Sequence, residues 1–175
     1  NITKEISMIK RFVTLGFLLS ICGSVWATST PITGTVEAKC AIFTTVNPKY
    51  GNPNPYTLTT LPASGGTEAI LRSDVLAADY FDLLITHPNS FSSSPTLTDS
   101  VGFTGASVVS AVGVSGMSVY ETNKLVVNNT TRFRLLLAGA TWYKISSVMV
   151  YGAGDVTALP AGNYTSLITA TCLAR

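Results

Sequence analysis

The sequence is poor in charged side chains and contains a single histidine, and both shortages limit what the chain can do. Only 11% of its 175 residues are charged, and the histidine, His87, precedes a proline, where we expect a loop. Nucleic-acid binding requires clustered cations, and an active site requires several titratable groups held together. We therefore expect no nucleic-acid partner, no catalytic residues and a protein that is not an enzyme.

Carboxylates give no convincing metal site either. Three of them lie close together in the sequence but lack the order Asp-x-Asp-x-Asp-Gly of a calcium loop, namely Asp74, Asp79 and Asp82. We interpret them as solvated charges. Two cysteines and one histidine make a weak zinc site, because a structural site takes four ligands. We expect neither a metal nor a cofactor.

The N-terminal part has the pattern of a secretory signal peptide. Lys10 and Arg11 form a basic start, and residues 12–22 form an apolar run. Val25 and Ala27 then fit the −3 and −1 positions of a cleavage site. The run is shorter than the roughly 20 residues that a transmembrane helix needs. We assign residues 1–27 to upstream residues and signal peptide, and we expect export and no membrane span in the mature protein.

The mature chain, residues 28–175, is expected to form one all-β domain. It is rich in Thr, Ser, Val and Gly, and turn residues separate its short apolar stretches. This rhythm is typical of a β-sandwich. Strands are predicted at 67–78 (in preference to a helix), 80–86, 101–103, 107–114, 124–127, 131–137 and 142–151, the last two as a hairpin around residues 138–140. In the last of them, Tyr143 to Tyr151, every second side chain is expected to face the core.

The first stretch of the mature chain, residues 31–43, alternates between apolar and polar side chains. One face carries Ile32, Gly34, Val36, Ala38, Cys40 and Ile42, and the other carries mainly threonine and charged residues. A period of two indicates a strand with one buried face.

Two cysteines remain after the signal peptide, Cys40 near the start of the mature chain and Cys172 near the end. An exported protein meets an oxidising compartment, so a disulfide is expected. Within one chain the bond would tie the two ends of the domain together. Between two chains it would link neighbouring subunits covalently.

Both ends of the mature chain resemble a known family. The opening Thr-Pro-Ile-Thr-Gly-Thr-Val-Glu-Ala-Lys-Cys-Ala-Ile (residues 30–42) and the following Lys-Tyr-Gly (49–51) are similar to the start of chaperone–usher pilins, in particular the archaic, spore-coat-U-like branch. The close, Pro-Ala-Gly-Asn-Tyr-Thr-Ser-Leu-Ile-Thr-Ala-Thr-Cys (160–172), resembles their last strand.

The resemblance implies an immunoglobulin-like sandwich of the pilin type that lacks its last strand. A periplasmic chaperone fills the gap, and the N-terminal strand of another copy replaces it at an outer-membrane usher. Such strand addition combines backbone hydrogen bonds with side chains that enter pockets. The inserting face would be Ile32, Gly34, Val36, Ala38 and Ile42, and the acceptor strand would present Tyr164, Ile168 and Ala170.

The expected function is then a structural subunit of an extracellular fimbria, used for adhesion or biofilm formation and exported through the periplasm to the cell surface. An alternative stays open, because residues 31–43 are the only N-terminal stretch before a proline-rich loop. If they form the domain's own first strand, the protein would be a self-complete secreted sandwich that binds a glycan or another protein.

Overall fold

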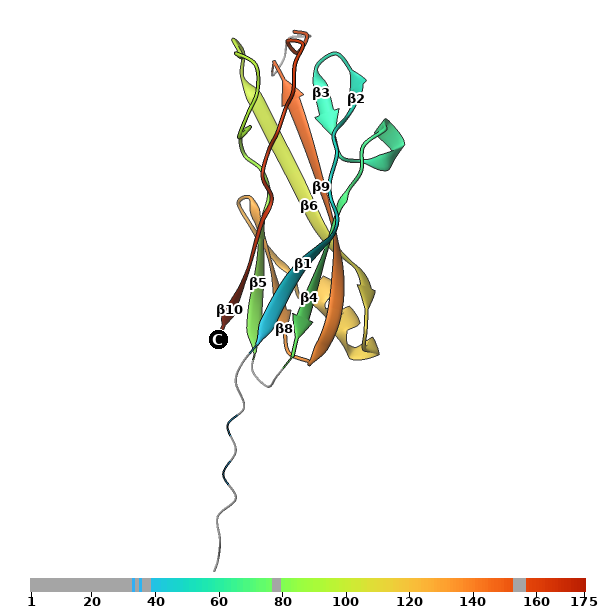
Figure 1. Ribbon diagram of the computed structural model, residues 1–175, viewed down its shortest axis with the longest axis vertical. Coiled ribbons are helices and arrows are strands. Elements are labelled where there is room, and N and C mark those ends of the chain that lie inside the picture. The colour runs from blue at the N-terminus through green and yellow to red at the C-terminus, as the bar shows by residue number, and fades with distance from the viewer. Residues whose placement is uncertain (1–32, 34, 36–38, 77–79, 153–156) are drawn as a thin grey trace, which may run out of the picture. The chain divides into compact units, whose positions relative to one another are not determined.

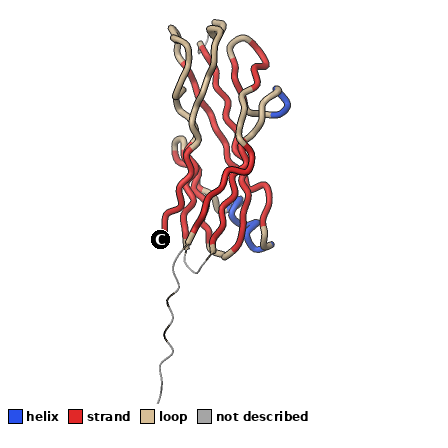
Figure 2. Tube along the Cα trace, viewed as in Figure 1, coloured by secondary structure: helices blue, strands red, loops and turns tan. Residues whose placement is uncertain are grey.

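The computed structural model describes residues 33, 35, 39–76, 80–152 and 157–175. In the unit Thr35–Arg175 these residues form two antiparallel sheets, and helix is confined to short segments (Figure 2). The strands are β1 (Cys40–Val46), β2 (Gly51–Asn54), β3 (Thr57–Thr59), β4 (Ala69–Val75), β5 (Phe81–Thr86), β6 (Val101–Val112), β7 (Leu125–Val127), β8 (Thr130–Leu135), β9 (Gly139–Tyr151) and β10 (Thr169–Ala174). The helical turns are η1 (Pro62–Ser64), η2 (Ser115–Ser118) and α1 (Val119–Thr122). The all-β prediction is confirmed.

The larger sheet is built around β9, the longest strand. The sheet has six strands in the order β1-β4-β9-β3-β2, with β6 paired to the other edge of β9 (Figure 1). The first half of β9 pairs with β4 and its second half with β3, while β6 runs along nearly its whole length. The outer strand of this sheet next to β4 is therefore β1.

The smaller sheet has four strands in the order β10-β5-β8-β7. Its central strands β5 and β8 bury every second side chain, as expected for a strand with one face on the core. The last strand of the chain, β10, lies at one edge of this sheet, and the short β7 lies at the other.

The core lies between the two sheets. The predicted inward face of β9 is confirmed, because Tyr143, Ile145, Met149 and Tyr151 are at most 1% exposed. Phe133 of β8 contacts Tyr143 with ring centroids 4.7 Å apart, which joins the smaller sheet to the larger one. Burial raises the pKa of Tyr143 to about 12, so this phenol stays neutral at physiological pH and serves packing.

The predicted hairpin of residues 131–137 and 142–151 is wrong. Both stretches are strands, but β8 belongs to the smaller sheet and β9 to the larger one. Their inward side chains face each other across the core, which two paired strands of one sheet cannot do. The two strands predicted between residues 101 and 114 are a single strand, β6, whereas β4 confirms the preference for a strand over a helix.

The loop prediction for His87 is confirmed, because β5 ends at Thr86, but the side chain is buried. The residue follows β5 directly and is only 3% exposed. Its Nε2 atom lies 3.2 Å from Thr131 Oγ1 and 3.3 Å from Ser107 Oγ. A Cβ on Gly105 would lie 2.4 Å from the imidazole Cγ, so the missing side chain at that position makes room for the ring.

The carboxylates that were considered as a cluster lie in different sheets. Asp74 of β4 accepts a hydrogen bond of 2.7 Å from Arg72 Nε, and Asp82 of β5 lies 3.5 Å from Arg175 Nε. Asp79 lies outside the described residues. Within the described part of the chain, no three His, Cys, Asp or Glu side chains are grouped as metal ligands. That part also contains no helix with the length and apolar character needed to cross a membrane.

Candidate functional site

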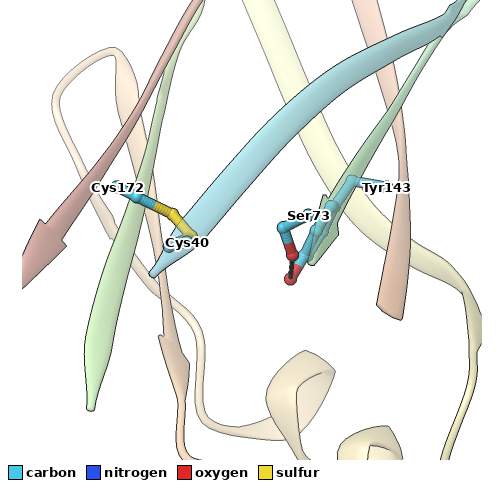
Figure 3. The surroundings of a disulfide bond; sticks show 4 residues. All are labelled: Cys40, Ser73, Tyr143 and Cys172. Carbon is cyan, nitrogen blue, oxygen red and sulfur yellow. Dashed lines mark hydrogen bonds between the residues drawn. A yellow bond between two sulfur atoms is a disulfide. The ribbon is translucent and has the colours of Figure 1, made fainter. Parts of the chain in front are cut away.

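The edge strand of each sheet meets the other along one side of the sandwich. There β1 of the larger sheet lies beside β10 of the smaller one. We call the space between these two strands the β1–β10 seam. The seam continues between the residues that follow β1 and the residues that precede β10. Cys40 and Cys172 form a disulfide across it, with Cα atoms 6.2 Å apart (Figure 3). The predicted disulfide is confirmed, and it lies within one chain.

The seam widens away from the disulfide. The two strands are closest at the end that carries Cys40 and diverge toward the other end (Figure 1). A cavity of about 480 Å³ lies at the wide end. Its lining comes from both sides of the seam and from the core between them: Pro48, Lys49, Tyr50, Leu58, Thr60, Pro88, Ser147, Gly162, Asn163, Tyr164, Thr165, Ser166 and Ile168.

Both strands that border the seam have one unpaired edge. Among the described residues, β1 pairs only with β4, and β10 pairs only with β5. The chain before β10 is also paired on one side, because Thr165 forms backbone hydrogen bonds with Ser93 on the side away from the seam. An open row of N–H and C=O groups is a template for another strand.

The predicted acceptor residues all lie along this seam and face the core. Ile168 and Ala170 pack against the core cluster near the disulfide, and Tyr164 packs against a second cluster around Met149. All three are only partly buried. Burial raises the pKa of Tyr164, whose hydroxyl donates a hydrogen bond of 2.5 Å to the Pro160 carbonyl. The seam therefore exposes apolar surface that a further strand would cover.

A tyrosine that the sequence analysis did not single out spans the wide end of the seam. The Tyr50 hydroxyl lies 2.6 Å from Ser166 Oγ and 3.4 Å from Ser147 Oγ. Tyr50 was noted only as part of Lys-Tyr-Gly, and no local pattern could connect it with a serine 116 positions later. This hydrogen bond joins the two sides of the seam at its wide end, where the Leu159 N–H also donates one of 2.8 Å to the Pro55 carbonyl.

The structure separates the residues predicted for the inserting face. Ile42 lies in β1, opposite Ser73 of β4, so it belongs to the domain's own sheet. This removes it from the set of donor residues, because its strand is already paired. Ile32, Gly34, Val36 and Ala38 lie outside the described residues. Among the described residues the first strand starts at Cys40, and most of the predicted stretch before it lies outside them.

The opposite side of the sandwich is closed by charged side chains. There β6 and β7 are the outer strands, and α1 lies near β6. Glu121 accepts a hydrogen bond of 2.8 Å from the Val109 N–H, and Lys124 donates one of 3.0 Å to the Ser107 carbonyl. The two side chains also form an ion pair with each other. Charged groups at a sheet edge discourage pairing with other chains.

Removing this cap is expected to make β6 associate with other molecules. In the double variant Glu121→Ala/Lys124→Ala, the backbone groups of Val109 and Ser107 lose their partners and become available to a foreign strand. Light scattering should show concentration-dependent association at neutral pH. The matched control is Glu68→Ala/Lys144→Ala, which removes a looser pair at 3.9 Å. Equal behaviour of both variants would contradict the assignment of Glu121 and Lys124 as an edge cap.

Comparison with family models, with curated proteins and with solved structures finds no match to this chain.

Proposed function

We propose that this protein is a structural subunit of an extracellular fimbria-like fibre, assembled by strand exchange between copies of the chain. The β1–β10 seam is the acceptor, and residues 28–38 are the donor. A periplasmic chaperone that occupies the seam before assembly and an outer-membrane usher are the further partners of this proposal. The subunit would pass through the periplasm to the cell surface and serve adhesion or biofilm formation.

The observation that carries the proposal is the order of the strands. In an immunoglobulin-type sandwich the strands A, B, E and D form one sheet, and C, F and G form the other. Here β1, β4, β9 and β6 follow the first order, and β5 and β10 stand where C and F would be. Among the described residues, no strand occupies the position of G, next to β10. This supports an immunoglobulin-like domain of the pilin type that lacks its last strand.

The physical gain from adding a strand here is large. A donor in the seam would pair with the open edge of β10 and cover Ile168, Ala170 and Tyr164. Each fully buried apolar side chain contributes roughly 1.5–3 kcal/mol, and the backbone groups of the edge gain partners. The alternating face of Ile32, Gly34, Val36 and Ala38 matches this requirement, since every second side chain would point to the core.

A charge on the donor face tests the proposal. In Val36→Asp the donor face would have to bury a carboxylate, whereas Thr35→Asp places the same charge on the opposite face of the alternating stretch. Unboiled samples of the protein exported to a periplasm should form a ladder of multimers for the unchanged chain and for Thr35→Asp. They should give a single band for Val36→Asp.

The acceptor side is tested with a truncated chain. Removal of residues 28–36 should leave a folded domain that adds to a fibre end but does not extend it. A ladder that persists in Val36→Asp, or a stable monomer from the unchanged chain, would contradict strand exchange and favour a self-complete secreted domain. Loss of folding in the truncated chain would contradict the assignment of these residues as a donor.

A further inference from the structure

We propose that the Cys40–Cys172 disulfide is a stop that fixes how far a donated strand can enter the β1–β10 seam, and so sets its register. This inference rests on the proposed function and adds a role for the disulfide beyond stabilising the fold. The disulfide belongs to the accepting subunit. The register of the donated strand would therefore be set by this covalent bond as well as by side-chain pockets.

The width of the seam at the disulfide supports this inference. Neighbouring strands lie 4.7–4.9 Å apart, so a strand between two others requires about 9.6 Å between its neighbours. The Cα atoms of Cys40 and Cys172 are only 6.2 Å apart (Figure 3). A backbone cannot pass between them while the bond is intact. An incoming strand must therefore end before this pair.

The length of the open part fits a short donor. On the side of β10 it extends from Asn163, which lines the cavity, to Ala170, two residues before Cys172. This distance accommodates a strand of about eight residues at 3.3 Å each. The donor segment 28–38 has eleven residues, so it can fill the open part and leave a short connection to its own domain.

The two ends of the seam differ in how firmly they are held. One end has a covalent bond, and the other has only hydrogen bonds, from Tyr50 to Ser166 and from the Leu159 N–H to the Pro55 carbonyl. A neutral hydrogen bond adds only about 1 kcal/mol to stability, so a competing strand can displace it. Entry is therefore expected from the end that carries Tyr50 and Ser166, toward the disulfide.

Peptides of different length test the stop. The acceptor is the mature chain with Val36→Asp, which does not donate its own segment, and it is compared with the same chain carrying Cys40→Ala and Cys172→Ala. The probes are labelled peptides of residues 28–38, alone or extended by Thr-Val-Thr at either end, and fluorescence anisotropy gives their dissociation constants. Circular dichroism checks that both acceptors are folded.

The extension that points toward Cys40 and Cys172 should distinguish the acceptors. We expect it to tighten binding about tenfold in the alanine variant, as burial of one more valine would, and to leave the affinity for the oxidised chain unchanged. Equal effects of each extension on both acceptors would overturn the stop and leave strand exchange intact. Binding of no peptide to either acceptor would overturn both proposals.

A second measurement needs no cysteine variant. A photoreactive residue placed at the end of the 28–38 peptide that enters the seam should label residues 163–170 of the oxidised chain when the peptide is bound. Labelling of residues 173–175, beyond the disulfide, would show that the strand passes the stop and would overturn the inference.

Discussion

Replacing Cys40 and Cys172 together by alanine is expected to lower the free energy of unfolding by about 5 kcal/mol. The two cysteines are 132 positions apart, so the bond removes much of the freedom of the unfolded chain. In the folded state it joins β1 to β10, which no backbone ladder connects among the described residues. Domains are typically stable by only 5–15 kcal/mol, so the variant would lose a large part of its stability.

Urea denaturation of the oxidised protein and of the double variant measures this loss. The midpoint should fall by roughly 2–3 M urea, given the slopes usual for small proteins. The reductant dithiothreitol should shift the midpoint of the oxidised protein to that of the variant and leave the variant unchanged. A midpoint that does not depend on the disulfide would contradict its role in holding the edges of the two sheets together.

The strands that sequence reasoning located best are those with one buried face. In β5 and β9 every second side chain is buried, and alternation carries that information directly. The same pattern does not say which sheet a strand joins. For that reason β8 and β9 were predicted as a hairpin, although their alternating side chains meet from opposite sheets. The contact between Phe133 and Tyr143 depends on this arrangement and has no local signal.

Part of the candidate site could likewise be predicted from the sequence and part could not. Tyr164, Ile168 and Ala170 follow one alternating face near the end of the chain, so their orientation toward the core could be predicted. The pairs that hold or close the edges could not, because their polar partners lie far apart in the sequence. Tyr50 reaches Ser166, and Glu121 reaches the backbone of β6. Such contacts arise only once the strands have been placed.

His87 should make the folded protein sensitive to mild acid. Its side chain is buried next to Thr131 and Ser107, neither of which carries a charge, and its Nδ1 atom has no hydrogen-bond partner among the described residues. A charged imidazolium at this position would lose its hydration and gain no counter-charge from these neighbours. Burial therefore lowers the pKa of His87 below its ordinary value of 6.5.

The direction of the pH effect follows from this lowered pKa. Below about pH 6.5 the unfolded chain binds a proton at His87, while the folded protein does so only at lower pH. Because the unfolded state then holds more protons, the free energy of unfolding is highest above pH 6.5. It decreases by at most about 1.4 kcal/mol per pH unit as the pH falls toward the lowered pKa.

Urea midpoints measured between pH 7.5 and pH 5 test this prediction. The unchanged protein should lose stability steadily below pH 6.5, whereas His87→Gln, which cannot take up a proton, should have a nearly flat profile over this range. Aspartate and glutamate ordinarily titrate near pH 4, so their contribution stays small in this window. A flat profile for the unchanged protein, or equal slopes for both, would show that the imidazole takes up a proton without cost at its place between Gly105 and Thr131. A slope confined to the unchanged protein would link acid sensitivity to the one buried imidazole that packs between the two sheets.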